Sequence, residues 1–135
     1  MVGGASFRGT TSSSDARRSE REMPMCFEMP WPPSVNGYWT SLRGRLVMSK
    51  KGRDYRFTVG AMVECDEPII GPVAVVICAQ PPDRRRRDLD NILKSTLDAI
   101  VHVGVLGDDS QIDDLRIYRG SIVPGGNLKV EVHPS

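Results

Sequence analysis

The chain contains 135 residues, of which 39% are hydrophobic and 26% are charged. A chain of about 100–200 residues commonly forms one domain, so we expect a single domain with a modest packed core. The formal net charge of +1 neither indicates nor excludes a nucleic-acid partner. No apolar run approaches the roughly 18 residues that cross a bilayer, and the N-terminus has no apolar signal-peptide core, so a membrane-spanning or secreted protein is not expected.

Three cysteines, Cys26, Cys65 and Cys78, are spread along the chain. Their odd number and wide spacing argue against a disulfide framework and against a zinc site. Cys78 lies in an apolar run and is expected to be a small core residue. These features predict a protein of a reducing compartment, the cytoplasm.

Residues 1–24 are dominated by Gly, Ser, Thr and Arg and contain almost nothing to bury, which predicts a flexible tail. A mis-assigned start, an arm that touches DNA and a segment without a role are all compatible with this composition. The folded domain is therefore expected to occupy residues 25–135.

The first part of the domain is expected to place two aromatic side chains in a loop. The short apolar segment Met25–Trp31 predicts a strand, and the Pro-Pro and Asn-Gly pairs within Pro32–Trp39 predict a loop. Tyr38 and Trp39 lie in that loop, where they either stack on exposed bases or fold back over the core. For Trp39 the two alternatives have equal support.

A short strand and then a helix are predicted next. Arg45–Met48 has strand character, and Ser49 is a suitable N-cap for a helix over Lys50–Cys65. Lys51 and Arg53 lie in its first turns, where cations are unfavourable against the helix dipole and an anionic partner would relieve that cost. The apolar residues that share one face of this helix are Tyr55, Val59, Met62 and Val63.

The sequence of the second half of the domain predicts one helix between strands. The β-branched run Val73–Ala79 predicts a central strand that is buried on both faces. Apolar residues at helical spacings from Leu89 onward predict a helix that stops near Gly104. The alternating segments Ile112–Arg119 and Leu128–His133 are separated by a Pro-Gly-Gly turn and are expected to form an antiparallel hairpin.

The segment R-R-R-R-D-L-D-N, at Arg84–Asn91, lies between the predicted central strand and the following helix. Arginine is always charged, and its planar guanidinium group matches the oxygens of a phosphate. The carboxylates of Asp88 and Asp90 suit a hard divalent cation. A phosphate-binding run beside a metal-binding pair indicates an enzyme that acts on a nucleic-acid backbone. The predicted DNA-binding residues are Arg84, Arg85, Arg86, Arg87, Lys50, Lys51 and Arg53.

Asp109, in the turn Gly107–Gln111, is predicted to join Asp88 and Asp90 in one carboxylate cluster. A divalent ion would relieve the repulsion among these groups, activate water and stabilise charge on the attacked phosphoryl group. Lys94, one helical turn after Asp90, is placed to hold an acidic ligand or to meet the transition-state charge. The structural alternative is a helix-capping Asp88 and a surface Asp90–Lys94 ion pair worth about 0.3–0.5 kcal/mol.

Four sequence blocks resemble the RusA family of Holliday-junction resolvases, endodeoxyribonucleases often carried by phages and prophages. The block P-P-D-R-R-R-R-D-L-D-N-I-L-K at Pro81–Lys94 is the most specific. The supporting blocks are P-P-S-V-N-G-Y-W at Pro32–Trp39, S-K-K-G-R-D-Y at Ser49–Tyr55 and G-V-L-G-D-D-S-Q-I at Gly104–Ile112. They follow one another in the family's order, and the N-terminal tail has no counterpart.

The resemblance implies a homodimer with a small α+β fold, in which a mixed sheet packs against two main helices. It also implies Mg²⁺-dependent cutting of four-way DNA junctions, with Mn²⁺ as a substitute. The catalytic metal ligands would be Asp88, Asp90 and Asp109, with Asp108 ranked below Asp109, and the functional lysine would be Lys94. Paired cuts in two-fold-related strands give a physical reason for a C₂ dimer. Two rivals stay open: a nuclease for other branched DNA, and a non-catalytic nucleic-acid-binding module.

Overall fold

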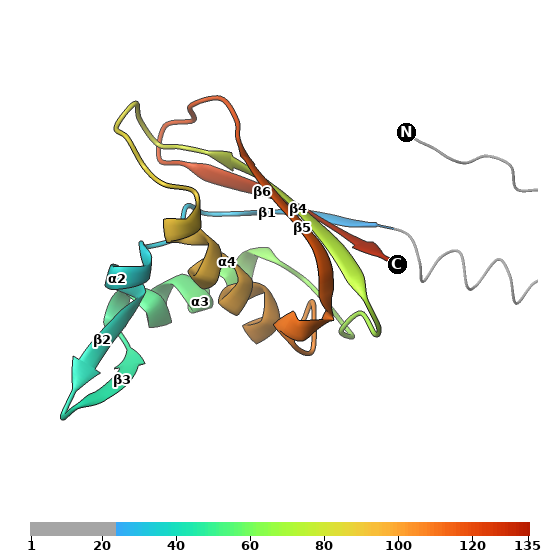
Figure 1. Cartoon of the computed structure of the whole chain (residues 1–135), viewed down its shortest axis with the longest axis horizontal. Helices are drawn as coiled ribbons and strands as arrows, with labels where there is room; N and C mark the ends of the chain where they lie inside the picture. Colours follow the sequence, from blue (N-terminus) through green and yellow to red (C-terminus); the bar gives the residue numbers. More distant parts are fainter. Residues whose placement is uncertain (1–23) are drawn as a thin grey trace, which may run out of the picture.

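Residues 24–135 are described by the computed structural model and form a mixed α+β fold (Figure 1). The predicted tail lies outside the described residues, apart from Pro24. Within residues 24–135, no helix is long and apolar enough to span a membrane. The elements, in chain order, are β1 (Met25–Met29), α2 (Val35–Tyr38), β2 (Trp39–Leu42), β3 (Arg45–Met48), α3 (Lys50–Met62), β4 (Val73–Gln80), α4 (Asp90–His102), η1 (Asp109–Gln111), β5 (Ile112–Arg119) and β6 (Asn127–Pro134).

The main sheet has four strands in the order β1-β6-β4-β5. β4 is parallel to β5 and antiparallel to β6, and β6 is antiparallel to β1. The expected mixed sheet with an interior β4 is therefore confirmed. The expected hairpin of β5 and β6 is wrong, because β4 lies between them. Alternation along β6 predicts which face is buried, but it does not specify which strand becomes the neighbour.

Helices α3 and α4 cover one face of this sheet (Figure 1). Val59 of α3 and Ile100 of α4 are fully buried in the same core as the sheet residues. The expectation that β4 is buried on both faces is wrong, because its other face, including Cys78, is only half-buried. The fully buried residues of β4 are Val73, Val75, Ile77 and Ala79.

Helix α3 begins where the sequence predicts. The Oγ of Ser49 accepts a hydrogen bond from the N–H of Gly52, with 3.0 Å between the two atoms. A Cβ on Gly52 would lie 2.6 Å from the carbonyl oxygen of Tyr38, so glycine allows α3 to approach that backbone closely. The helix ends at Met62 rather than Cys65, and Met62 is half exposed instead of lying on the buried face.

Helix α4 also follows its prediction closely. It begins at Asp90, directly after Leu89, and ends at His102. Gly104 then adopts a φ of 93°, and its N–H donates to the carbonyl oxygen of Val101 at 3.0 Å. This is the glycine stop that the sequence predicts, since a positive φ costs glycine little.

The expected loop Pro32–Trp39 is partly helical, because it contains α2 and reaches the first residue of β2. Tyr38 is fully buried, and its ring lies edge-on to that of Trp39 at a centroid distance of 5.3 Å. Tyr38 therefore covers the core and is not available to stack on bases. Trp39 is half-buried and packs against the same core. Strands β2 and β3 form a separate two-stranded sheet.

Candidate functional site

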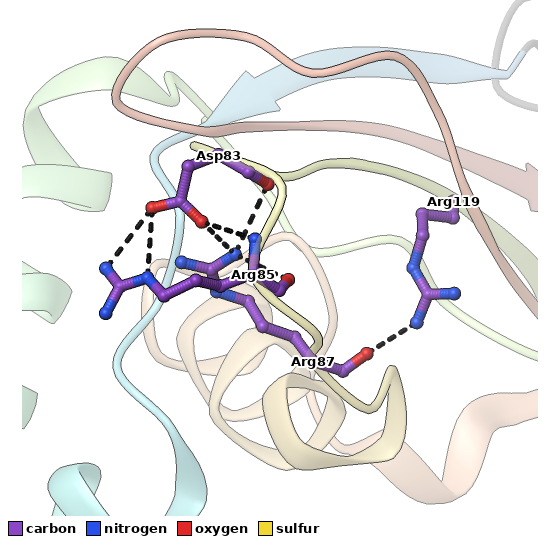
Figure 2. A network of polar contacts seen from close by, with 4 residues as sticks. All are labelled: Asp83, Arg85, Arg87 and Arg119. Carbon is purple, nitrogen blue, oxygen red and sulfur yellow. Dashed lines mark hydrogen bonds and ion pairs between the residues drawn. The ribbon is translucent and has the colours of Figure 1, made fainter.

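The loop between β4 and α4 carries the arginine run, and Asp83 organises it (Figure 2). The Oδ1 of Asp83 accepts a hydrogen bond from the backbone N–H of Arg85 at 2.9 Å. The same carboxylate forms ion pairs with Nη2 of Arg85 at 3.2 Å and with Nη1 of Arg87 at 2.7 Å. The bond from Arg87, followed by those from Arg85, lowers the pKa of Asp83 below its ordinary value.

Arg87 holds this loop against the protein. Its side chain is only 22% exposed, and its guanidinium carbon lies 5.9 Å from the ring centroid of Trp31, a cation–π contact. Its Nη1 also donates to the carbonyl oxygen of Arg85 at 3.1 Å. The guanidinium of Arg119 donates to the carbonyl oxygen of Arg87, which ties the loop to the end of β5 (Figure 2). The guanidinium of Arg87 is thus occupied by contacts within the protein.

Arg84 and Arg86 differ from their two neighbours. Both are exposed, and neither forms an ion pair with any group in residues 24–135. Together with Trp31 and Asp88 they line an open hollow of about 650 Å³. The four adjacent arginines therefore divide into two that pair with Asp83 and two whose charge is available to a phosphate.

Asp88 and Asp90 follow directly and are both exposed. Neither carboxylate takes part in an ion pair or a side-chain hydrogen bond within the described part of the chain. The N-cap position of α4 is occupied by Leu89 without a side-chain cap, and Asp88 contributes only its carbonyl oxygen, to the N–H of Asn91 at 3.2 Å. The structural alternative, a capping Asp88 and an Asp90–Lys94 ion pair, is therefore not what this subunit forms.

Asp109 and Lys94 both line a second hollow of about 190 Å³ between β2, α4 and η1. Lys94 is one turn along α4 from Asp90, about 6 Å along the helix axis. Asp108, the neighbour of Asp109, caps η1 by accepting the N–H of Ser110 at 3.1 Å, and the bonds from Ser110 lower the pKa of Asp108. Of the two aspartates in this turn, Asp109 is the one whose carboxylate has no such bond within residues 24–135.

Trp39 lines the same hollow, and its indole Nε1 is buried with no hydrogen-bond partner in the described residues. A buried donor of this kind normally has an acceptor, which a water molecule or a bound phosphate supplies when the protein does not. Trp39 therefore packs against the core and also lines the hollow that holds Lys94 and Asp109.

Comparison with known proteins shows the family of this chain. The family described as endodeoxyribonuclease RusA matches residues 30–133. The chain belongs to the RusA family. The crossover junction endodeoxyribonuclease rusA of Enterobacteria phage HK97 is 41% identical over 109 residues, which cover 78% of this chain and 91% of that protein. The proteins of the same name from Enterobacteria phage 82 and Escherichia coli K12 are 39% and 38% identical over 107 residues, covering 77% of this chain and 89% of each relative.

Two of the three predicted carboxylates of this RusA-family chain are suitable ligands for a divalent ion, and the third lies in another hollow. Asp88 and Asp90 present exposed hard oxygen donors, and Mg²⁺ usually takes only one or two protein carboxylates. Asp109 lines a different hollow, and within residues 24–135 of one subunit no three His, Cys, Asp or Glu side chains form a group that could hold a metal ion. The expected convergence of all three aspartates is therefore not formed in this single subunit.

The predicted basic residues at the start of α3 are also divided. Lys50 forms an exposed ion pair with Asp54, with 2.9 Å between Nζ and Oδ2. Arg53 donates from Nη1 to the carbonyl oxygen of Met48 at 2.9 Å. Lys51 is exposed and has no ion-pair partner among the described residues. Lys51 is therefore the member of this group whose charge is most available to DNA.

A polar network behind the site was not predicted from the sequence. The guanidinium of Arg56 binds the carboxylate of Asp98 through two bonds, 2.9 Å from Nε to Oδ2 and 2.8 Å from Nη2 to Oδ1. The hydroxyl of Tyr38 donates to the same carboxylate. The network joins α2, α3 and α4 beneath the hollow of Lys94 and Asp109. The spacing of Asp98 from Lys94 indicates a shared helix face, but nothing local indicates Arg56 as its partner.

The division of the arginines makes a testable prediction for DNA binding by this RusA-family protein. Replacing Arg84 and Arg86 together by Gln should reduce the slope of log affinity against log salt by about 2, because two phosphate contacts are lost. The matched variant Arg85→Gln removes the same kind of side chain from a group that already pairs with Asp83, and its slope should change by less than about 0.5. Titrations with fluorescent DNA at several salt concentrations measure both. Equal slopes for the two variants would contradict the division.

Proposed function

We propose that this chain is a structure-selective endodeoxyribonuclease that resolves four-way DNA junctions by paired symmetrical cuts in the presence of Mg²⁺, within the cytoplasm of a bacterial host. The observation that carries the proposal is the order of side chains from the loop after β4 into the first residue of α4. Arg84 and Arg86, which lack acidic partners within residues 24–135, come shortly before Asp88 and Asp90, which lack basic ones. Family membership, and the printed names of the relatives, support the same activity.

Asp88 and Asp90 hold the divalent ion in this proposal, and Asp109 completes the ligand set. Three like charges repel, so without a cation the carboxylates have no reason to gather, whereas an ion removes that penalty. Asp109 lies on an exposed turn of three residues, where a small rearrangement disturbs little of the core. When bound, the ion supplies a water of lowered pKa and charge neutralisation at the attacked phosphoryl group.

The basic side chains bind the DNA strand and stabilise charge in the transition state. Arg84 and Arg86 bind the strand on the side of the first hollow, and Lys94, which lines the second hollow with Asp109, supplies its ammonium to the attacked phosphate. A cation at that position stabilises charge that develops on the phosphoryl oxygens, which is worth most in the transition state. Contacts of this kind recognise phosphate geometry rather than base sequence.

We further propose that the active form is a homodimer. Resolution of a junction into two intact duplexes requires cuts in two strands related by a two-fold axis. A C₂ dimer carries two identical sites in that relation, whereas one subunit could make only one cut for each encounter.

A cleavage assay tests the proposed activity. Purified protein is incubated with an end-labelled four-way junction, a flap, a fork or a linear duplex of matched sequence, in Mg²⁺, in Mn²⁺ or with chelator. We expect paired nicks at symmetrical positions in the junction, in either metal and not in chelator, and no cutting of the duplex. Equal cutting of flaps, forks and junctions would favour a nuclease for other branched DNA. Tight binding without cutting in either metal would favour a non-catalytic module.

A further inference from the structure

The two-stranded arm formed by β2 and β3, residues 39–48, contributes only Trp39, at its base, to the site described above. It is a sheet of its own and stands away from the main sheet and helices (Figure 1). Trp39 pairs with Met48 at its base, and Leu42 pairs with Arg45 at its tip. The tip is a tight turn in which Arg43 and Gly44 have φ values of 53° and 78°, the left-handed conformations of a two-residue hairpin turn.

The base of the arm is held firmly. The ring of Trp39 packs edge-on against the buried ring of Tyr38. The N–H of Ser49 donates to the carbonyl oxygen of Tyr38 at 2.9 Å, and its hydroxyl donates to that of Gly37 at 2.5 Å. A two-stranded hairpin is marginally stable on its own, so this anchoring is what keeps the arm in a fixed position.

The tip of the arm is apolar on both of its faces. Leu42 is 59% exposed and Leu46 is 70% exposed. Residues paired across an antiparallel ladder share a face, so Leu42 shares one face with Arg45, while Leu46 shares the other with Ser41. The two leucines therefore lie on opposite sides of a thin ribbon, where neither can cover the other from water.

The tip is also basic. Arg43 and Arg45 are exposed, and neither has an ion-pair partner within residues 24–135. Two copies of the arm packed together through their leucines would bring four arginines close to one another, which like-charge repulsion opposes. DNA has both a negative backbone and apolar base faces, so its phosphates can pair with the arginines while its bases cover the leucines.

We propose that the arm is a wedge that enters the branch point of a DNA junction, with Leu42 and Leu46 against base faces and Arg43 and Arg45 on the flanking phosphates. The inference rests on the proposed function, because it names how that substrate is recognised. Leucine is among the apolar side chains that proteins insert between base pairs, at an unstacking cost of a few kcal/mol for each step. At a branch point the continuous stacking of the duplex is already interrupted, which reduces this cost.

The test uses the full chain and a four-way junction with 2-aminopurine at one branch-point base, in chelator so that no strand is cut. Binding of the wild-type protein should raise the fluorescence of the probe, because that base loses its stacking partner. The variant L42S/L46S should lose most of this rise and bind the junction about tenfold more weakly. The variant I70S is the matched control, since Ile70 is 92% exposed and distant in sequence from the arm, and it should behave as wild type. The variant R43Q/R45Q should lower the salt slope of binding by about 2.

Three results would overturn the wedge. The first is a wild-type fluorescence rise that persists in L42S/L46S. The second is cleavage of the junction by the wild-type protein with no fluorescence change on binding, which would leave the proposed function intact and remove only the wedge. The third is conversion of L42S/L46S to a smaller oligomer in sedimentation, which would assign the leucines to a contact between subunits. Failure of the wild-type protein to bind or cut any junction would instead remove the proposed function together with the wedge.

Discussion

Replacing Asp90 by Asn is expected to lower the rate of junction cleavage by at least about a thousandfold and to leave junction affinity within about threefold of wild type. The amide keeps the size of the side chain but removes the negative charge that would hold a divalent ion. In the proposed function, DNA binding depends on basic side chains such as Arg84 and Arg86, which the substitution does not touch. Single-turnover cleavage of a labelled junction measures the first quantity, and fluorescence anisotropy in chelator measures the second.

Asp113→Asn is the matched control for this variant. Asp113 lies near the start of β5, is exposed, and forms no ion pair within residues 24–135, so the change removes the same charge from another part of the surface. It should leave cleavage within about twofold, since surface substitutions away from functional groups have small effects. If Asp90→Asn weakened binding and left residual cutting at the wild-type rate per bound junction, the carboxylate would be a binding group and the proposed role would be wrong.

Local signals were sufficient to predict where the two main helices begin and where α4 ends, but not where α3 ends. The hydroxyl of Ser49 and the positive φ of Gly104 act within about four residues, so the information that places them lies in the adjacent sequence. The neighbours of a strand depend on longer distances. β6 follows β5 along the chain but pairs with β1 and β4, because that arrangement buries Leu128 and Val130 beneath helices that come from earlier segments.

The candidate site likewise depends on contacts that the local sequence does not predict. Four identical arginines in a row look equivalent in the sequence. In the structure, Asp83 forms ion pairs with Arg85 and Arg87, and within residues 24–135 Arg84 and Arg86 have no acidic partner. That division follows from the turn of the loop, which a charge pattern does not describe. That Asp109 and Lys94 line one hollow depends in turn on how η1 packs against α4, which is a tertiary contact rather than a spacing.

Replacing Asp98 by Asn is expected to lower the free energy of unfolding at pH 7 by about 2 kcal/mol, which corresponds to a fall in Tm of about 8 °C for a domain of this size. The substitution leaves the guanidinium of Arg56, whose side chain is 26% exposed, without its carboxylate partner. It also weakens the bond from the hydroxyl of Tyr38. Thermal or denaturant unfolding followed by circular dichroism measures the loss.

The difference in unfolding free energy between wild type and Asp98→Asn should shrink as the pH falls. Burial acts to raise the pKa of Asp98, but the hydrogen bonds from Arg56 and Tyr38 outweigh it, and the folded-state pKa lies below the ordinary value. A group with a lowered folded-state pKa stabilises the protein above its unfolded-state pKa, about 3.9 for aspartate, and that stabilisation is lost as the pH falls through the folded-state value. The two unfolding free energies should therefore converge below about pH 4 and differ fully at neutral pH.

Asp114→Asn provides the comparison that isolates this effect. Asp114 also pairs with an arginine, Arg116, but at 3.4 Å and with both side chains more than half exposed. An exposed pair of this kind contributes about 0–1 kcal/mol, so its removal should change the unfolding free energy by less than about 1 kcal/mol at any pH. Equal losses from the two substitutions at pH 7, or a loss in Asp98→Asn that stays constant into the acid range, would mean that the charge of Asp98 does not hold α3 and α4 together.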